Sequence, residues 1–214
     1  MKLSPKIKSL NLGMAKRLFL ILFLNFGLVY GSVAQIVLLP DSLTKPHFRP
    51  RTTAAALLGI NLASLENFNG SDSRLGLMLG FTGEYQFSNL LGIAAELNYS
   101  QQGTGTVEAE YKLNYLKFPI LLTLHDNNFL LQAGLYGAVL LKAKAGYGQW
   151  TEDVTDSFTN TDTGMSLGLA YSFSGNTLFG VRFQRGFDNV NKSIVNRKVE
   201  LLNSALQLYG GYTF

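Results

Sequence analysis

The sequence predicts an all-β fold, an eight-stranded antiparallel up-and-down transmembrane β-barrel. In eight segments, apolar residues alternate with small or polar residues at a period of two, as in strands with two different faces. Short and long connections alternate between these segments, which is typical of membrane barrels whose two rims face different compartments. Charged residues make up only 15% of the chain, fewer than the roughly 25% of a typical soluble domain.

The first 34 residues are expected to form a removable signal peptide. Lys16 and Arg17 precede the apolar run LFLILFLNFGLVY, and Ser32 and Ala34 supply the small residues of a cleavage site. This run is shorter than the roughly 20 residues of a transmembrane helix, which disfavours the alternative of a membrane anchor.

The same segment accounts for the basic character of the chain. The formal net charge is +4, but five of the 18 basic residues and none of the 14 acidic residues lie before residue 35. The remainder is close to neutral, so the charge does not predict a nucleic-acid partner. Met14 is an alternative start to Met1, because MAKRLFLILFLNFGLVYGSVA is a complete signal by itself.

The eight expected strands follow one another along the rest of the chain. They cover residues 53–62, 74–87, 91–101, 111–124, 129–142, 164–173, 177–187 and 202–214. Residues 88–90, 125–128 and 174–176 form tight connections, and residues 63–73, 102–110, 143–163 and 188–203 form longer, polar ones. The sequence therefore predicts a barrel domain over residues 53–214, preceded by a periplasmic lead-in over residues 35–52.

The two faces of each strand indicate which one contacts lipid. In the second segment Leu75, Leu77 and Phe81 share one face, while Gly76 and Gly80 share the other. A barrel of about eight strands has room inside only for side chains, which suits the face of small residues. A soluble barrel would expose many Lys and Glu residues, and neither face does so. The face of large apolar residues is therefore expected to contact lipid.

Four charged residues lie on the small-residue face of four different segments: Glu84, Glu96, Lys117 and Arg182. An isolated charge in a packed interior is unfavourable, so these residues are expected to form a connected network across the lumen. Arg182 is the expected centre because its guanidinium can bind two carboxylates. The alternative is a selective pore lined by these charges.

Three further features depart from the regular pattern. Arg185 interrupts the apolar face of the seventh segment and is expected at the outer interface, snorkelling or contacting lipid phosphates. Pro119 cannot donate to a strand ladder, so a bulge or a missing hydrogen bond is expected there. Residues 146–164 hold four acidic residues and the only Trp. They are interpreted as a solvated acidic loop, with cation or partner binding as the alternative.

The sequence predicts no enzyme, no cofactor and no metal site. The chain has no cysteine and only two histidines. His47 lies in the lead-in and His125 in a tight turn, and neither lies on a strand beside a Ser and an acid, as a hydrolytic site would need.

Three stretches, GIAAELNYSQQG, YLKFPILL and FLLQAGLYGAVLL, precede a glycine pair and a final aromatic residue. Together they resemble the PorT-like outer-membrane β-barrel family of Bacteroidetes over about residues 52–214. The resemblance implies an eight-stranded barrel in the outer membrane of a Gram-negative bacterium. The namesake takes part in type IX protein secretion, but the family has no shared catalytic residues, and the resemblance does not transfer the secretion role.

The expected function is structural or interactive, with an accessory role in protein secretion or surface assembly as one form of it. A small porin-like pore or transporter is the alternative, and a lipid-modifying enzyme is a distant third. The expected partners are outer-membrane lipid, a secretion or surface protein, and the barrel assembly machinery. Leu208, Tyr212 and Phe214 alternate along the last segment and are expected to face lipid as the signal that this machinery reads.

Overall fold

The computed structural model describes residues 48–67, 72–105, 110–147, 150–173, 176–190, 192 and 201–214. The expected signal peptide and most of the expected lead-in lie outside these residues. Among the described residues, no helix has the length and hydropathy needed to cross a membrane.

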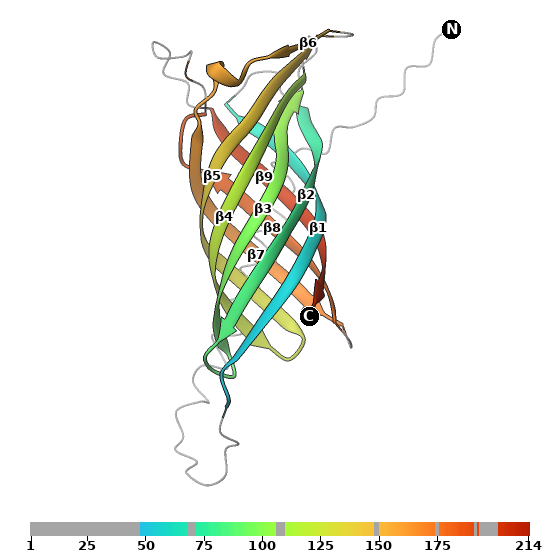
Figure 1. Cartoon of the computed structure of the whole chain (residues 1–214), viewed down its shortest axis with the longest axis vertical. Helices are drawn as coiled ribbons and strands as arrows, with labels where there is room; N and C mark the ends of the chain where they lie inside the picture. Colours follow the sequence, from blue (N-terminus) through green and yellow to red (C-terminus); the bar gives the residue numbers. More distant parts are fainter. Residues whose placement is uncertain are drawn as a thin grey trace, which may run out of the picture. The chain divides into compact units, whose positions relative to one another are not determined.

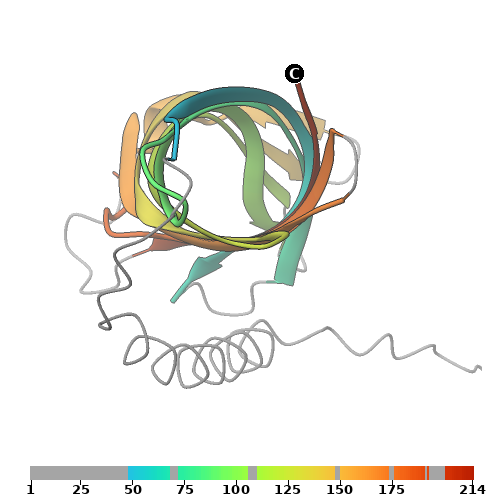
Figure 2. The same ribbon diagram turned by 90° about the horizontal axis from the view of Figure 1, so that it is seen from below.

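Eight long strands close into one antiparallel barrel within the described residues (Figures 1 and 2). They are β1 (Arg51–Glu66), β2 (Asp72–Gln86), β3 (Leu91–Gly105), β4 (Glu110–Asp126), β5 (Phe129–Tyr147), β7 (Thr161–Ser172), β8 (Thr177–Gly186) and β9 (Leu202–Thr213). Each strand pairs with its neighbours in the chain, and β1 pairs with β9 to close the ring. The predicted fold class is confirmed.

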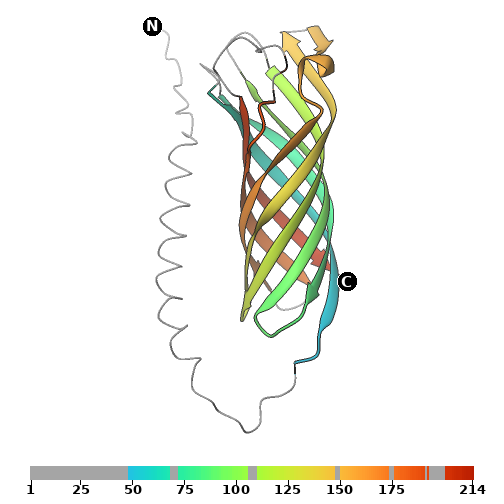
Figure 3. The ribbon, with the colours of Figure 1, turned by 90° about the vertical axis from the view of Figure 1, so that its left-hand side faces the viewer.

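Closure pairs each of the eight described barrel strands on both sides. The ladder between β1 and β9 runs from Ala55 opposite Thr213 to Glu66 opposite Leu202, and the Phe214 N–H donates to the Ala54 carbonyl at 2.9 Å. In lipid every backbone group must find a partner within the protein, and a closed ladder provides this. The C-terminus consequently lies beside the start of β1 (Figures 1 and 3).

The predicted alternation separates the lumen from the outer surface. On β2, Leu75, Leu77 and Phe81 are more than half exposed, whereas Met78 between them is fully buried. Large apolar side chains are exposed on other strands as well, among them Ile93, Ile120 and Leu135. The outer surface of the barrel therefore offers side chains that are compatible with lipid.

One hairpin extends beyond the region expected to be strand. β5 continues to Tyr147 and pairs with the short β6 (Trp150–Asp153), which is followed by a 3-10 turn, η1 (Thr155–Ser157). Figure 3 shows this hairpin at the end of the barrel opposite the C-terminus. Part of the segment predicted as a polar loop is thus ordered structure packed on the strands.

A register shift in the β4–β5 ladder determines the direction of Lys142. Asn114 pairs with Lys142 but Tyr115 pairs with Leu140, so Leu141 is an extra residue on β5. Alternation alone places Lys142 in the lumen. The bulge turns it outward instead, because one inserted residue reverses the facing of all residues that follow.

Pro119 interrupts a ladder without shifting it. β3 pairs with β4 in one register from Ala95 opposite Ile120 to Asn98 opposite Lys117, but the ladder skips the intervening residues of β3, Glu96 and Leu97. Proline has no N–H to donate, so a local gap in the ladder is expected. Of the two predicted outcomes, the structure shows the gap at Pro119, and the bulge at Leu141 lies in the neighbouring β4–β5 ladder.

Candidate functional site: the barrel lumen

A buried ion pair crosses the middle of the lumen. Arg182 on β8 donates to Glu96 on β3 through two hydrogen bonds of 2.6 and 2.7 Å, and both side chains are fully buried. β3 and β8 lie four strands apart in the ring of eight, so they form opposite walls of the barrel. This bidentate pair therefore connects the two walls.

Neutral polar groups surround this pair, although Arg182 Nε and Asn98 Oδ1 have no hydrogen-bond partner among the described residues. Arg182 also donates to the Gln132 amide oxygen at 2.9 Å, and the same oxygen accepts a 2.9 Å bond from the Tyr209 hydroxyl. Asn98 donates to Glu96 at 2.8 Å, and the Arg182 guanidinium lies 4.9 Å from the Tyr209 ring centre. A desolvated ion pair is tolerated only with such additional partners.

Glycines create the space for these long side chains. A Cβ added to Gly80 would overlap the Asn98 amide, and one added to Gly168 would contact Gln132 and Arg182. The small residues of the predicted lumen face thus leave room for a few large polar side chains. Small and large residues together fill the lumen.

A second cluster surrounds Lys117 on the long-connection side of that pair. Lys117 is fully buried, donates to Gln184 at 3.1 Å, and lies 4.1 Å from the centre of the Tyr136 ring. Asp162 is also buried and accepts bonds from Tyr136 at 3.2 Å and from Asn203 at 3.0 Å. Lys117 on β4 and Asp162 on β7 both lie opposite Ala138 of β5. The two charged residues are therefore on the strands that flank β5.

Asp162 was missed as a lumen residue by the sequence reasoning, which assigned it to the acidic loop of residues 146–164. The signal was present, since Asp162, Gly164 and Ser166 continue the lumen-facing alternation of β7. Asp162 was assigned to the loop because the residues before it are mostly polar.

A third cluster lies near the short-turn mouth. Glu84 accepts a hydrogen bond from the Thr123 hydroxyl, and its carboxylate also contacts the His125 ring nitrogen Nε2. The Glu84 side chain retains 13% exposure, unlike the sealed Glu96. His125 belongs to the end of β4 and not to the turn where it was predicted.

The four predicted lumen charges therefore share one face but not one network. The hydrogen bonds of the described residues join Arg182 to Glu96, while Lys117 and Glu84 belong to two separate clusters. Arg182 binds one carboxylate instead of two. It acts as the centre of a layer of neutral amides and one tyrosine.

The mouth with the long connections is closed by apolar side chains. A buried cluster combines strand residues with three residues from the connections, Phe158, Val190 and Leu201. Backbone bonds hold these connections together, from Thr159 N–H to the Val190 carbonyl and from Val190 N–H to the Leu201 carbonyl, both at 2.9 Å. An apolar layer thus lies above the polar middle of the lumen.

A cavity of about 50 Å³ lies on the short-turn side of the ion pair and is lined by Glu84, Glu96 and Arg182, among others. Such a volume holds a few water molecules. Within the described residues, no group of three or more His, Asp or Glu side chains is arranged to hold a metal ion.

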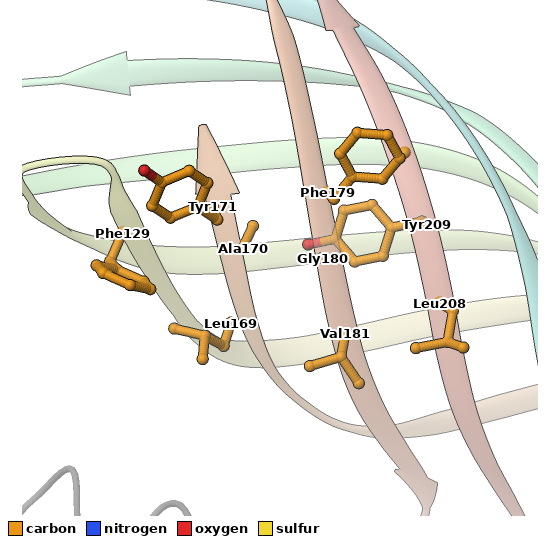
Figure 4. A pocket seen from close by; sticks show the side chains of 10 residues that line it. Phe129, Leu169, Ala170, Tyr171, Phe179, Gly180, Val181, Leu208 and Tyr209 are labelled. Atoms are coloured by element: carbon orange, nitrogen blue, oxygen red, sulfur yellow. The ribbon is translucent and has the colours of Figure 1, made fainter. Parts of the chain in front are cut away.

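A large apolar depression, of about 530 Å³, lies on the lipid-facing surface over β5, β7, β8 and β9. Phe129, Leu169 and Tyr171 lie on one side of it, and Phe179 and Leu208 on the other (Figure 4). An aromatic series follows its short-turn edge, with ring centres 4.8–5.5 Å apart from Phe129 through Tyr171 and Phe173 to Phe179. Such rings are typical of the aromatic girdle at a membrane interface.

The residues of the predicted assembly signal lie on the same outer surface. Leu208, Tyr212 and Phe214 are 51%, 53% and 73% exposed, and the rings of Tyr212 and Phe214 meet edge to face at 5.8 Å. Leu208 also lines the apolar depression. These side chains are accessible to a partner within or beside the membrane.

Comparison with known proteins identifies the broad class of this barrel. Residues 51–192 match the model of a family described as outer membrane protein beta-barrel domain. This match places the protein in the bacterial outer membrane. A comparison with curated protein sequences returned no match.

Solved structures share the fold at low sequence identity. Neisserial surface protein A matches with a TM-score of 0.50 and 13% identity, over 78% of this chain and all of that one. Ail of Yersinia pestis, in a complex with the heparin analogue sucrose octasulfate, matches with a TM-score of 0.47 and 14% identity, over 78% of this chain and all of that one. The first likeness supports the closed barrel architecture and nothing finer.

Proposed function

Since the chain belongs to the outer membrane protein beta-barrel domain family, we propose that it is a non-conducting, non-enzymatic barrel with a structural or interaction role. The observation that supports this proposal is the filled lumen. The Arg182–Glu96 pair connects opposite walls with both side chains fully buried, and the apolar cluster around Phe158 covers one mouth. Both layers obstruct the lumen of the described barrel, so no steady ion current is expected through it.

The alternative function is a small pore, and conductance distinguishes the two. The purified barrel reconstituted in planar lipid bilayers is expected to give no steady channel current. A variant that combines Arg182→Ala, Glu96→Ala and Phe158→Ala removes both layers and serves as the open control. A steady, large conductance of the unaltered protein would overturn the proposal.

An accessory role in protein secretion is the finer form of the proposal. Its support is the resemblance of GIAAELNYSQQG and YLKFPILL to the PorT-like family of Bacteroidetes. Crosslinking in intact outer membranes followed by co-purification tests it. Reproducible recovery of a secretion or surface protein, absent when an unrelated barrel is purified in the same way, supports the role. Recovery of barrel assembly components alone counts against it.

The barrel assembly machinery is the second proposed partner. Leu208, Tyr212 and Phe214 support this proposal because they face outward along one side of β9. Replacing Tyr212 and Phe214 with Ser is expected to lower the assembled fraction in the outer membrane several-fold. Phe81→Ser and Phe118→Ser, at exposed sites on β2 and β4, form the control pair for loss of apolar surface. An equal loss in both pairs would contradict a signal on β9.

A further inference from the structure

Three lysines share the outward face of β4 and β5 at the end that carries the long connections. Lys112 on β4 lies directly opposite Lys144 on β5, and Lys142 lies one step along the same face. Ala143, between the two β5 lysines, and Ala145, directly after them, are fully buried on the lumen side. The lysines therefore point away from the lumen.

The bulge at Leu141 creates this arrangement. Without the extra residue, the alternation of β5 would direct Lys142 and Lys144 into the lumen and Ala143 outward. Bulges commonly redirect side chains at functional positions of barrel rims. Here the bulge brings two positive charges to the outer surface, next to the positive charge of Lys112.

These lysines lie at the depth of lipid headgroups. Beyond Phe129, which belongs to the aromatic series, the outward apolar residues of β5 run from Leu131 to Leu141, and Lys142 follows immediately. Ten residue steps of about 3.3 Å, tilted by about 40°, span roughly 25 Å, the height of the apolar band in outer-membrane barrels. Because long connections of such barrels face outward, the lysines are at the headgroups of the outer leaflet.

The carboxylates nearby do not neutralise this cluster. Lys112 contacts Glu110 at 3.2 Å, and Lys142 contacts Asp153 at 3.3 Å. Glu110 is shared with Arg74, which it binds at 2.7 Å. Both lysine pairs are about half exposed, and exposed pairs of this kind contribute little.

Two further observations indicate that a bound anion would stabilise the lysine cluster. Lys144 lies opposite Asp153 in the β5–β6 ladder, but among the described residues it has no carboxylate within ion-pair distance. Asp153 is held by Thr155, whose hydroxyl donates to it at 2.6 Å, and these hydrogen bonds lower the pKa of Asp153 below its ordinary value. Like charges directly opposite on a sheet are unfavourable, so the pair Lys112 and Lys144 gains from a bound counter-charge.

We propose that Lys112, Lys142 and Lys144 form a binding site for the phosphate groups of a phosphorylated glycolipid in the outer leaflet. The lipid chains lie against the apolar band below, at Val139 and Leu141, which are exposed on the same face. The phosphates meet the ammonium groups directly above. This site depends on the location in the outer membrane and is independent of whether the lumen conducts.

The test compares two variants in native mass spectrometry of the full-length barrel in detergent. The probes are bisphosphorylated lipid A and the same lipid without its phosphates. The unaltered protein is expected to bind the phosphorylated form at least about 10-fold more tightly. Lys112→Gln with Lys144→Gln is expected to weaken that binding by about 20- to 30-fold, since each basic residue near an anionic surface contributes a factor of roughly five.

The controls separate this site from general charge and from folding. Arg49→Gln with Lys192→Gln removes two exposed charges elsewhere and is expected to leave binding unchanged. Lys112→Arg with Lys144→Arg keeps the charges and is expected to keep binding within about three-fold. Equal affinity for both lipids, equal loss in the control pair, or displacement of the lipid by inorganic phosphate at equal concentration would overturn the proposal.

Discussion

The middle and the long-connection mouth of the lumen are closed by opposite chemistry. In the middle, Arg182 and Glu96 form a fully buried ion pair between opposite walls. At the mouth, Phe158, Val190 and Leu201 pack as apolar side chains against the strands. The stability of the first region depends on the pairing of its charges, and that of the second on the packing of its side chains. Substitutions in the two regions should therefore change the free energy of unfolding by different amounts.

The ion pair predicts the largest effect. Arg182→Met is expected to lower the free energy of unfolding by about 3–5 kcal/mol, because it leaves Glu96 buried without its counter-charge. Urea unfolding of the barrel in lipid vesicles, followed by the heat-dependent gel shift, measures this loss.

A double substitution tests whether the loss of the ion pair causes this destabilisation. Arg182→Met combined with Glu96→Leu is expected to recover most of the stability, since replacing both partners by apolar groups removes the uncompensated charge. If the double variant were less stable than Arg182→Met, packing around the guanidinium would matter more than its charge.

The apolar mouth predicts a smaller loss. Phe158→Ala is expected to cost about 2–3 kcal/mol, near the lower end for a buried aromatic residue, because the connections can partly collapse into the space. Trp150→Ala in the neighbouring hairpin is the control, since Trp150 is 79% exposed and is expected to change stability by less than about 0.5 kcal/mol. A similar loss from both substitutions would show that the apolar cluster is not a sealed layer.

The sequence was sufficient for the barrel and for the facing of most residues. Alternation is a local property, and Leu75, Leu77 and Phe81 show it without any knowledge of neighbouring strands. The connection lengths then determine which strands pair. The bulge at Leu141 was not predicted, because one extra residue in an otherwise regular strand is defined only by the partner strand. The adjacent Leu140 and Leu141 were the sole local sign of it.

The lumen network was predicted less well than the lumen face. Alternation places Glu84, Glu96, Lys117 and Arg182 on one face, but it does not give their heights along the barrel axis. Those heights depend on strand tilt and stagger, which put Glu84 at the short-turn mouth and Lys117 beside Asp162. Which charged side chains meet in the lumen depends on the register of the closed barrel, and only the three-dimensional structure gives that register.

The smallest expected effect is that of a Glu→Gln substitution near the short-turn mouth, and it is compared with the same substitution in the middle of the lumen. Glu84→Gln is expected to cost only about 1 kcal/mol, because its amide oxygen still accepts the Thr123 hydrogen bond and the site retains solvent contact. Glu96→Gln makes the same chemical change beside the sealed Arg182 guanidinium, and it is expected to cost about three times as much. Both losses are measured by the same urea unfolding in vesicles. Equal costs would mean that water reaches Glu96 as readily as Glu84, and the polar middle of the lumen would then be hydrated and not a dry barrier.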